Sequence, residues 1–153
     1  MKKRTATEVL LADHKMIRKI MSDLEWTHPR FDDLSKTLHR IIVSHAWFED
    51  EIFLPAFQSE PRLNRRFVDE IIQEHKDINV LLGLAREQRK KWDKNGELAY
   101  WQFKSILDAH FKKEEDGLFP IAEKILNSEG LNALGDEMER RKTDVRRFID
   151  EIK

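Results

Sequence analysis

The chain contains no cysteine, and this absence limits the chemistry that its sites can perform. Disulfide bonds, thiolate metal ligands, iron–sulfur clusters and thiol nucleophiles are all excluded. Any metal ion must therefore be held by nitrogen and oxygen ligands.

Glycine and proline are scarce, with 5 and 4 residues among 153. The sequence shows no convincing strand alternation, and helical patterns flank the Asn95-Gly96 pair, which elsewhere would suggest a hairpin turn. We therefore predict an all-α fold.

Long apolar runs and an excess of one charge sign are also missing. The 28 basic and 29 acidic residues give a net charge of −1, which does not attract phosphate backbones, so we expect no nucleic-acid partner. Because no segment resembles a signal peptide or a membrane span, we expect no membrane partner and a soluble, cytoplasmic protein. The length suits one domain over residues 1–153.

Hydrophobic residues at three- and four-residue spacing predict four long helices and a closing helical segment. Thr5 and Glu8 are expected to form a capping box at the start of the first helix. The first two helices are expected over residues 6–26 and 32–54. The third is expected to begin at Pro61, or after a short lead-in there, and to end at residue 92, and the fourth to begin at residue 97 and to have its end disturbed by Gly117 and Pro120. The closing segment is expected to begin near Leu131 and to turn Met138, Val145, Phe148 and Ile149 inward.

The two halves of the sequence resemble each other. His45 and Glu49 match His110 and Glu114, and in both halves a proline follows ten residues after the histidine. Two further matched groups are Asp13-His14-Lys15 with Glu74-His75-Lys76, and Asp50-Glu51 with Glu115-Asp116. This repeat predicts an antiparallel up-down four-helix bundle with a pseudo-twofold internal repeat, followed by the C-terminal helical segment.

Residues four apart on a helix lie on the same face, so each matched histidine and glutamate can point at the same spot. Two buried carboxylates without partners would cost several kcal/mol. The pattern therefore predicts a metal site whose ligands face the core of the bundle: His14, His45, Glu49, His75, His110 and Glu114. His28 and His39 lie off this stripe and are not expected to be ligands.

With these six residues in this order, the chain resembles the hemerythrin-like family, whose domain is named for cation binding by a His-His-Glu pattern. The resemblance covers about residues 5–150. It implies two iron ions joined by an oxo or hydroxo group, with manganese or zinc as alternative metals. By resemblance, His14 and His45 would bind one ion, His75 and His110 the other, and Glu49 and Glu114 would bridge them.

The sequence departs from the oxygen-carrying members, which have a further histidine one turn after the third-helix ligand. Asn79 occupies that position here, and Arg18 is its match in the first half. Their last carboxylate is an aspartate five residues after the histidine, where this chain has Glu115, so Glu115 is an alternative ligand; Asp50 is another. The missing histidine implies open metal positions for dioxygen or nitric oxide.

We therefore expect a non-haem di-iron protein that binds dioxygen or nitric oxide for sensing, delivery or detoxification. Two alternatives remain open, a di-iron oxidoreductase consuming peroxide or nitric oxide and a protein that binds and donates iron. A zinc-holding helical interaction domain is a weaker one. A sensor would have to signal through a partner protein that the sequence does not identify.

Overall fold

The computed structural model describes residues 3–151, with side chains described for residues 3–142 and for Asp144. Over this range the chain is helical and contains no strand, which confirms the predicted all-α class. The α-helices are α1 (Ala6–Asp23), α2 (Phe31–Phe48), α3 (Arg65–Lys90), α4 (Lys94–Lys113), α5 (Phe119–Ile125) and α6 (Ser128–Glu151). None of the described helices is both long enough and apolar enough to cross a membrane.

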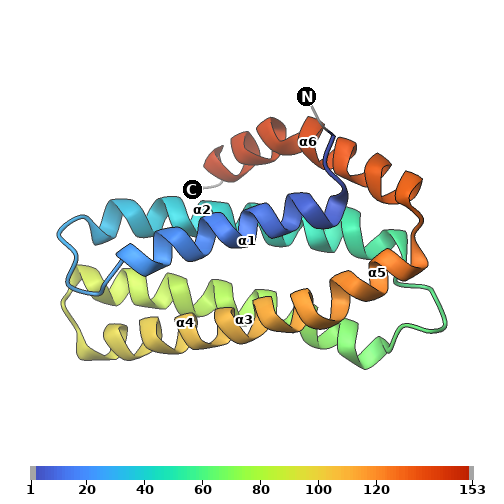
Figure 1. Ribbon diagram of the computed structural model, residues 1–153. Helices are drawn as coiled ribbons and strands as arrows, with labels where there is room; N and C mark the ends of the chain where they lie inside the picture. Colours follow the sequence, from blue (N-terminus) through green and yellow to red (C-terminus); the bar gives the residue numbers. More distant parts are fainter. Residues whose placement is uncertain (1–2, 152–153) are drawn as a thin grey trace.

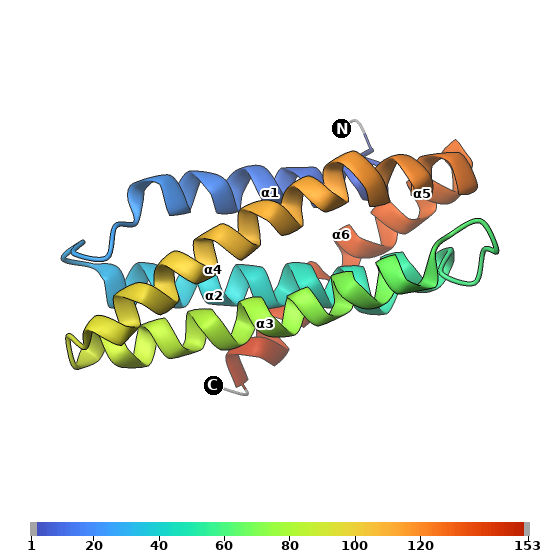
Figure 2. The same ribbon diagram turned by 90° about the horizontal axis from the view of Figure 1, so that it is seen from below.

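Four long helices, α1 to α4, lie side by side along the length of the molecule, as Figure 1 shows. Helix α6 packs against α1 and α2 on one side of this bundle. The view from below in Figure 2 shows the other side, where α3 and α4 are not covered by α6.

Local capping explains where the helices begin. The predicted capping box is confirmed, because the Glu8 backbone N–H donates to the Thr5 hydroxyl and the Thr5 backbone N–H donates to the Glu8 carboxylate. Helix α3 begins at Arg65 rather than near Pro61, since the Asn64 side chain caps it by accepting from the backbone of the next turn.

Helix α4 begins earlier than expected, at Lys94, because the Asp93 carboxylate accepts from the backbone N–H of Asn95 at 2.9 Å. Asn95 and Gly96, which lie between the two helices expected to end at residue 92 and to begin at residue 97, are therefore helical. A Cβ on Gly96 would lie 2.5 Å from the Cβ of Gln88 and 2.6 Å from the Trp26 ring, so only glycine lets these segments approach so closely.

The end of the fourth helix is disturbed near Gly117 and Pro120, as expected, because α4 ends at Lys113, but the chain does not leave helical geometry there. A π-helical turn, Glu114–Leu118, continues directly from α4 into α5. In this turn the backbone N–H of Phe119 donates to the carbonyl of Glu114, five residues back, and Pro120 follows in the first turn of α5. A first-turn proline is tolerated because its missing N–H is not needed there.

Two apolar clusters fill the core, one toward each end of the bundle, and a layer of histidine and glutamate lies between them along every long helix. On α1, for example, Leu10 belongs to one cluster and Ile17 to the other, with His14 between. Met138 of α6 is fully buried, as predicted. The predicted inward positions Val145, Phe148 and Ile149 lie outside the described side chains.

We predict that Gly135→Ala destabilises the protein by about 1–3 kcal/mol, because the new Cβ would overlap the backbone carbonyl of Arg4, where α6 crosses the N-terminal segment. Thermal or urea unfolding measures this loss. Gly83→Ala is the matched control: the nearest atom to its Cβ is 3.7 Å away, so helix propensity should raise stability by up to about 1 kcal/mol. Similar stability of both variants would show that the α6 crossing is looser than described.

Candidate metal centre

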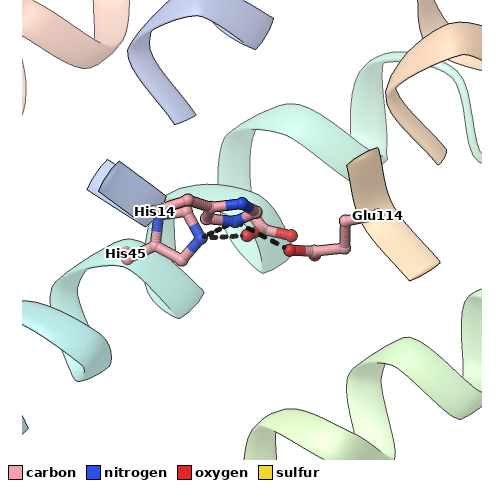
Figure 3. Close-up of side chains that lie close together, drawn as sticks. His14, His45 and Glu114 are labelled. Atoms are coloured by element: carbon pink, nitrogen blue, oxygen red, sulfur yellow. Dashed lines mark hydrogen bonds and ion pairs between the residues drawn. The ribbon is translucent and has the colours of Figure 1, made fainter. Parts of the chain in front are cut away.

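The layer between the apolar clusters brings together the six residues predicted as ligands, and all six are buried. Each of the four long helices contributes a histidine, and the two glutamates follow directly after α2 and α4. Figure 3 shows the imidazoles of His14 and His45 pointing toward the carboxylate of Glu114. His28 and His39 lie in neither of the two groups that these side chains form.

The six residues form two groups that could each hold a metal ion. The first group is His14, His45, Glu49 and Glu114, and the second is Glu49, His75, His110 and Glu114. Within each group the ligand atoms all lie within 4.8 Å of one another. Both glutamates belong to both groups, so the two groups lie side by side and share their carboxylates.

The separate oxygens of each glutamate face different histidines. Glu114 Oε1 lies 3.1 Å from His14 Nε2, while its Oε2 lies 3.3 Å from His110 Nε2. Glu49 Oε1 contacts His45 Nε2, and its Oε2 lies 3.7 Å from His75 Nε2. Each carboxylate therefore spans the two groups.

The two glutamates start π-helical turns at matched positions, Glu49–Phe53 and Glu114–Leu118. A π turn inserts one extra residue per hydrogen-bonded ring and often marks a functional site. Here it begins at the residue whose carboxylate faces the layer, one turn after His45 or His110.

Every histidine of the centre makes a hydrogen bond from Nδ1 to a carboxylate on its outer side. His14 bonds Glu115 at 2.7 Å, and His45 bonds Asp13 at 3.0 Å. The matched pairs of the other half are His75 with Asp50 and His110 with Glu74, both at 2.8 Å. An ionised carboxylate can only accept, so each Nδ1 carries the proton and each Nε2 of a neutral ring presents a lone pair to the centre.

The sequence analysis missed the role of these four outer carboxylates, because it gave Asp13 and Glu74 only as part of the repeat and offered Asp50 and Glu115 as alternative metal ligands. Asp13 and Glu74 directly precede His14 and His75, and Asp50 and Glu115 directly follow the two glutamates. The repeat contained the signal, since all four positions are acidic in both halves. Because Asp50 and Glu115 are hydrogen-bonded to the outer edges of His75 and His14, they face away from the shared centre.

The donor set fits a metal ion. His14 Nε2 and His45 Nε2 lie 3.1 Å apart. If both rings are neutral, each carries its one proton on Nδ1, where it is donated to an outer carboxylate, so the two Nε2 atoms face each other with lone pairs and no hydrogen between them. Among the described residues, several inner atoms lack a hydrogen-bond partner: Glu49 Oε1 and Oε2, His75 Nε2, His110 Nε2 and Glu114 Oε2. Converging lone pairs on imidazole nitrogen and carboxylate oxygen suit iron, manganese or zinc.

Without a metal, the same centre would take up protons. Burial by itself would lower the pKa of His75, but the hydrogen bond to Asp50 and the nearby carboxylates of Glu114 and Glu49 raise it to about 10. The pKa of His110 is likewise raised, to about 9, because Glu114 outweighs the burial. Burial and the charge of Glu114 raise the pKa of Glu49.

Three of the outer carboxylates, Asp13, Glu74 and Glu115, have lowered pKa values. Burial would raise the pKa of Asp13, but the hydrogen bond and charge of His45 lower it below its usual value. The pKa of Glu115 is also lowered, because its hydrogen bonds to Arg18 and His14 outweigh the effect of its partial burial. A fixed negative charge on the outer edge of an imidazole strengthens the ring as a metal ligand.

A small cavity of about 10 Å³ lies beside the centre. Its walls are apolar apart from three of the histidines: Ile17, Ile42, His45, Ala46, His75, Ile78, Leu107, His110 and Phe111. This volume is close to the least that holds one water-sized molecule. A larger groove of about 360 Å³ lies between α1 and α4, and Leu107 and Phe111 line both spaces, so they separate the cavity from the groove.

Comparison with known proteins supports this description. The model of the hemerythrin HHE cation binding domain matches residues 5–100 and 66–153 of the chain. A solved structure with a similar fold is a hemerythrin HHE cation binding domain-containing protein from Mycobacterium kansasii, with a TM-score of 0.78 and 22% sequence identity. The match covers 94% of this chain and 88% of that one. Comparison with curated proteins found no significant match.

We predict that the metal-free protein loses stability as the pH rises from about 6.5 to about 10. The pKa values of His75 and His110 are raised in the folded state, so their protonation stabilises the fold fully below the unfolded value of 6.5. That contribution disappears as the pH passes through the folded values of about 9 and 10. Urea unfolding of chelator-treated protein at a series of pH values measures it.

Metal-loaded protein is the control for this pH series, because a metal on the Nε2 atoms replaces the protons and removes most of the dependence. A metal-free protein whose free energy of unfolding stays level or rises over the same range would contradict the protonated centre.

We predict that Asp50→Ala weakens metal binding by about 10- to 100-fold, because His75 loses the acceptor that orients its ring. Glu51→Ala removes the neighbouring carboxylate, which is exposed, and should leave the affinity unchanged. Competition with a coloured chelator measures both. Equal affinities would rule out the orienting role of Asp50.

Proposed function

Because the chain belongs to the hemerythrin HHE cation-binding domain family, we propose that it is a non-haem di-iron protein that binds dioxygen or nitric oxide at open iron positions. His14 and His45 would hold one iron, His75 and His110 the other, and Glu49 and Glu114 would bridge them. The observation that carries the proposal is the pair of four-residue groups sharing both glutamates. The domain would span residues 1–153 as an antiparallel up-down four-helix bundle with an internal repeat.

Bound iron would supply the redox-active, gas-binding chemistry, and the residues of the chain control access to it. The cavity beside His45, His75 and His110 has apolar walls, which favour a small uncharged molecule over an ion. Its volume of about 10 Å³ matches a molecule of two or three atoms better than an organic substrate. Size and polarity together favour a diatomic gas.

The position of Asn79 supports an open metal site. The Arg86 guanidinium, which can only donate, bonds His39 Nδ1 at 2.8 Å, so His39 Nε2 carries the proton and donates to Asn79 Oδ1 at 2.6 Å. Asn79 is exposed and held toward His39. It therefore does not replace the additional histidine of the oxygen carriers.

The groove between α1 and α4 favours a second candidate function, a di-iron oxidoreductase that consumes peroxide or nitric oxide. Turnover would need an electron donor, and a space of about 360 Å³ separated from the cavity by Phe111 has room for an organic one. Sustained consumption of peroxide or nitric oxide with a reductant would favour this function over simple binding.

The proposed function predicts about two iron ions per chain, one for each group, after anaerobic reconstitution with ferrous iron. Adding nitric oxide to the reduced protein should then change its optical and paramagnetic resonance spectra. His45→Ala should lose both iron and the response, because an inner ligand is gone, whereas His28→Ala, which lies outside both groups, should retain them.

Each contrary outcome points to a different function. Rapid loss of iron to a chelator, with no gas response, would favour iron binding and donation. Uptake of zinc but not iron would leave the zinc-holding interaction domain. Equal iron content in wild type, His45→Ala and His28→Ala would mean that the six residues are not the ligands.

A further inference from the structure

The two halves of the centre have matched ligands but different surroundings. Arg18 and Asn79 occupy equivalent positions of the sequence repeat, one turn after His14 and His75. Phe111 and Ala46 are equivalent too, directly after His110 and His45. Both differences concern the surroundings of one histidine, His14, because Arg18 bonds its acceptor Glu115 and Phe111 stacks on its ring.

Arg18 holds the carboxylate that orients His14. Its Nη1 donates to Glu115 Oε2 at 2.6 Å and its Nη2 to Oε1 at 3.1 Å, so the planar fork engages both oxygens. Glu115 Oε2 also accepts from His14 Nδ1 at 2.7 Å. The Glu115 side chain is 25% exposed, and without the fork it would be free to rotate into water.

The second route from Arg18 to His14 runs through an aromatic ring. Phe111 stacks on the His14 imidazole, with ring centroids 3.7 Å apart and planes 14° from parallel. The Arg18 guanidinium carbon lies 5.2 Å from the centroid of Phe111. His14 is therefore held at its edge by Glu115 and on its face by Phe111, and Arg18 contacts both.

The matched histidine, His75, has neither support. Among the described residues, no lysine or arginine forms an ion pair with its acceptor Asp50. Asn79 accepts from His39 instead, and Ala46 offers no ring to stack. The small cavity is lined by Ala46 and His75, whereas His14 is not among its walls.

Lys113 supplies a cation to the second half, but it acts differently. Lys113 donates to Glu74 Oε2, whereas His110 donates to Glu74 Oε1. The oxygen that orients the histidine is therefore not the one that the lysine binds. A lysine is a mobile point charge, while the arginine fork fixes the plane of the carboxylate. The support of His14 is therefore the more rigid one.

We infer that Arg18 is a positioning residue that fixes the His14 imidazole through Glu115 and Phe111, so that the two matched halves of the centre retain their metals with unequal strength. This inference rests on the proposed function. The ion held by His14 and His45 is the more tightly retained, and the ion held by His75 and His110 leaves first.

The test is release of ferrous iron from the reconstituted full chain to a coloured chelator under anaerobic conditions. Wild type should release iron in a fast and a slow phase. Arg18→Ala should accelerate the slow phase roughly 10-fold, so that the two phases approach each other, and Arg18→Lys should restore part of the difference. Arg65→Ala is the matched control, because its ion pair with Asp69 at 3.7 Å is exposed and remote from the centre.

A measurement without metal separates positioning from general destabilisation. In nitrogen NMR spectra of metal-free protein, the Nδ1 proton of His14 should exchange faster with water in Arg18→Ala than in Arg65→Ala, while the Nδ1 proton of His45 keeps its wild-type rate. Single-phase release from wild type, or identical behaviour of Arg18→Ala and Arg65→Ala, would overturn the inference and leave the proposed function standing. Failure of wild type to take up iron would overturn both.

Discussion

Converging lone pairs in a water-poor core are the constraint on which the rest of this structure depends. Four imidazole Nε2 atoms and four carboxylate oxygens face one another across two groups of atoms, each within 4.8 Å. Such an arrangement is repulsive unless protons or metal ions lie between the atoms, because each lone pair has given up water on burial. The raised pKa values of His75 and His110 express the same constraint in the metal-free protein. A metal ion at each group would satisfy it and would leave the Nδ1 protons of the histidines on their hydrogen bonds to the outer carboxylates.

The position of the polar layer between two apolar clusters explains why the fold tolerates the free-energy cost of burying these polar atoms. Each long helix enters the layer from one apolar cluster and leaves it into the other, so the chain is anchored on both sides of the centre. Phe48 and Phe53 pack on one side, and Phe31 and Phe103 on the other, all nearly or fully buried. Burial of such rings contributes on the order of 2–3 kcal/mol each, which offsets the desolvation of a few polar atoms. The layer can therefore be prepared for a metal before the metal arrives, and its pH dependence is a property of the folded apoprotein.

The sequence was sufficient to predict the parts of this arrangement that depend on periodicity along one helix. One-turn spacing placed His45 with Glu49 and His110 with Glu114, and the capping box at Thr5 set the start of α1. What it did not predict depends on contacts between helices or on hydrogen-bond register. The outer carboxylates meet histidines that are 25 to 101 residues away, so adjacency in sequence did not reveal their partners. The π turns at Glu49 and Glu114 leave no compositional signal in the sequence. The second π turn leads directly into α5, so the chain stays helical through Pro120. The assignment of the six residues as ligands stays a prediction until metal is measured.

The two halves of the sequence agree in the residues of the centre and in the outer carboxylates, and they differ beyond them. All four histidine–carboxylate pairs follow the repeat, and each carboxylate orients an imidazole whose Nε2 faces the centre. Beyond these pairs the matched positions differ. Arg18 corresponds to Asn79, and the buried Phe111 corresponds to Ala46. These substitutions do not alter which atoms can bind a metal, but they decide how rigidly each histidine is held and where space is left for a small molecule. Two halves with matched inner residues can therefore differ in function, and the difference lies in residues outside the two groups.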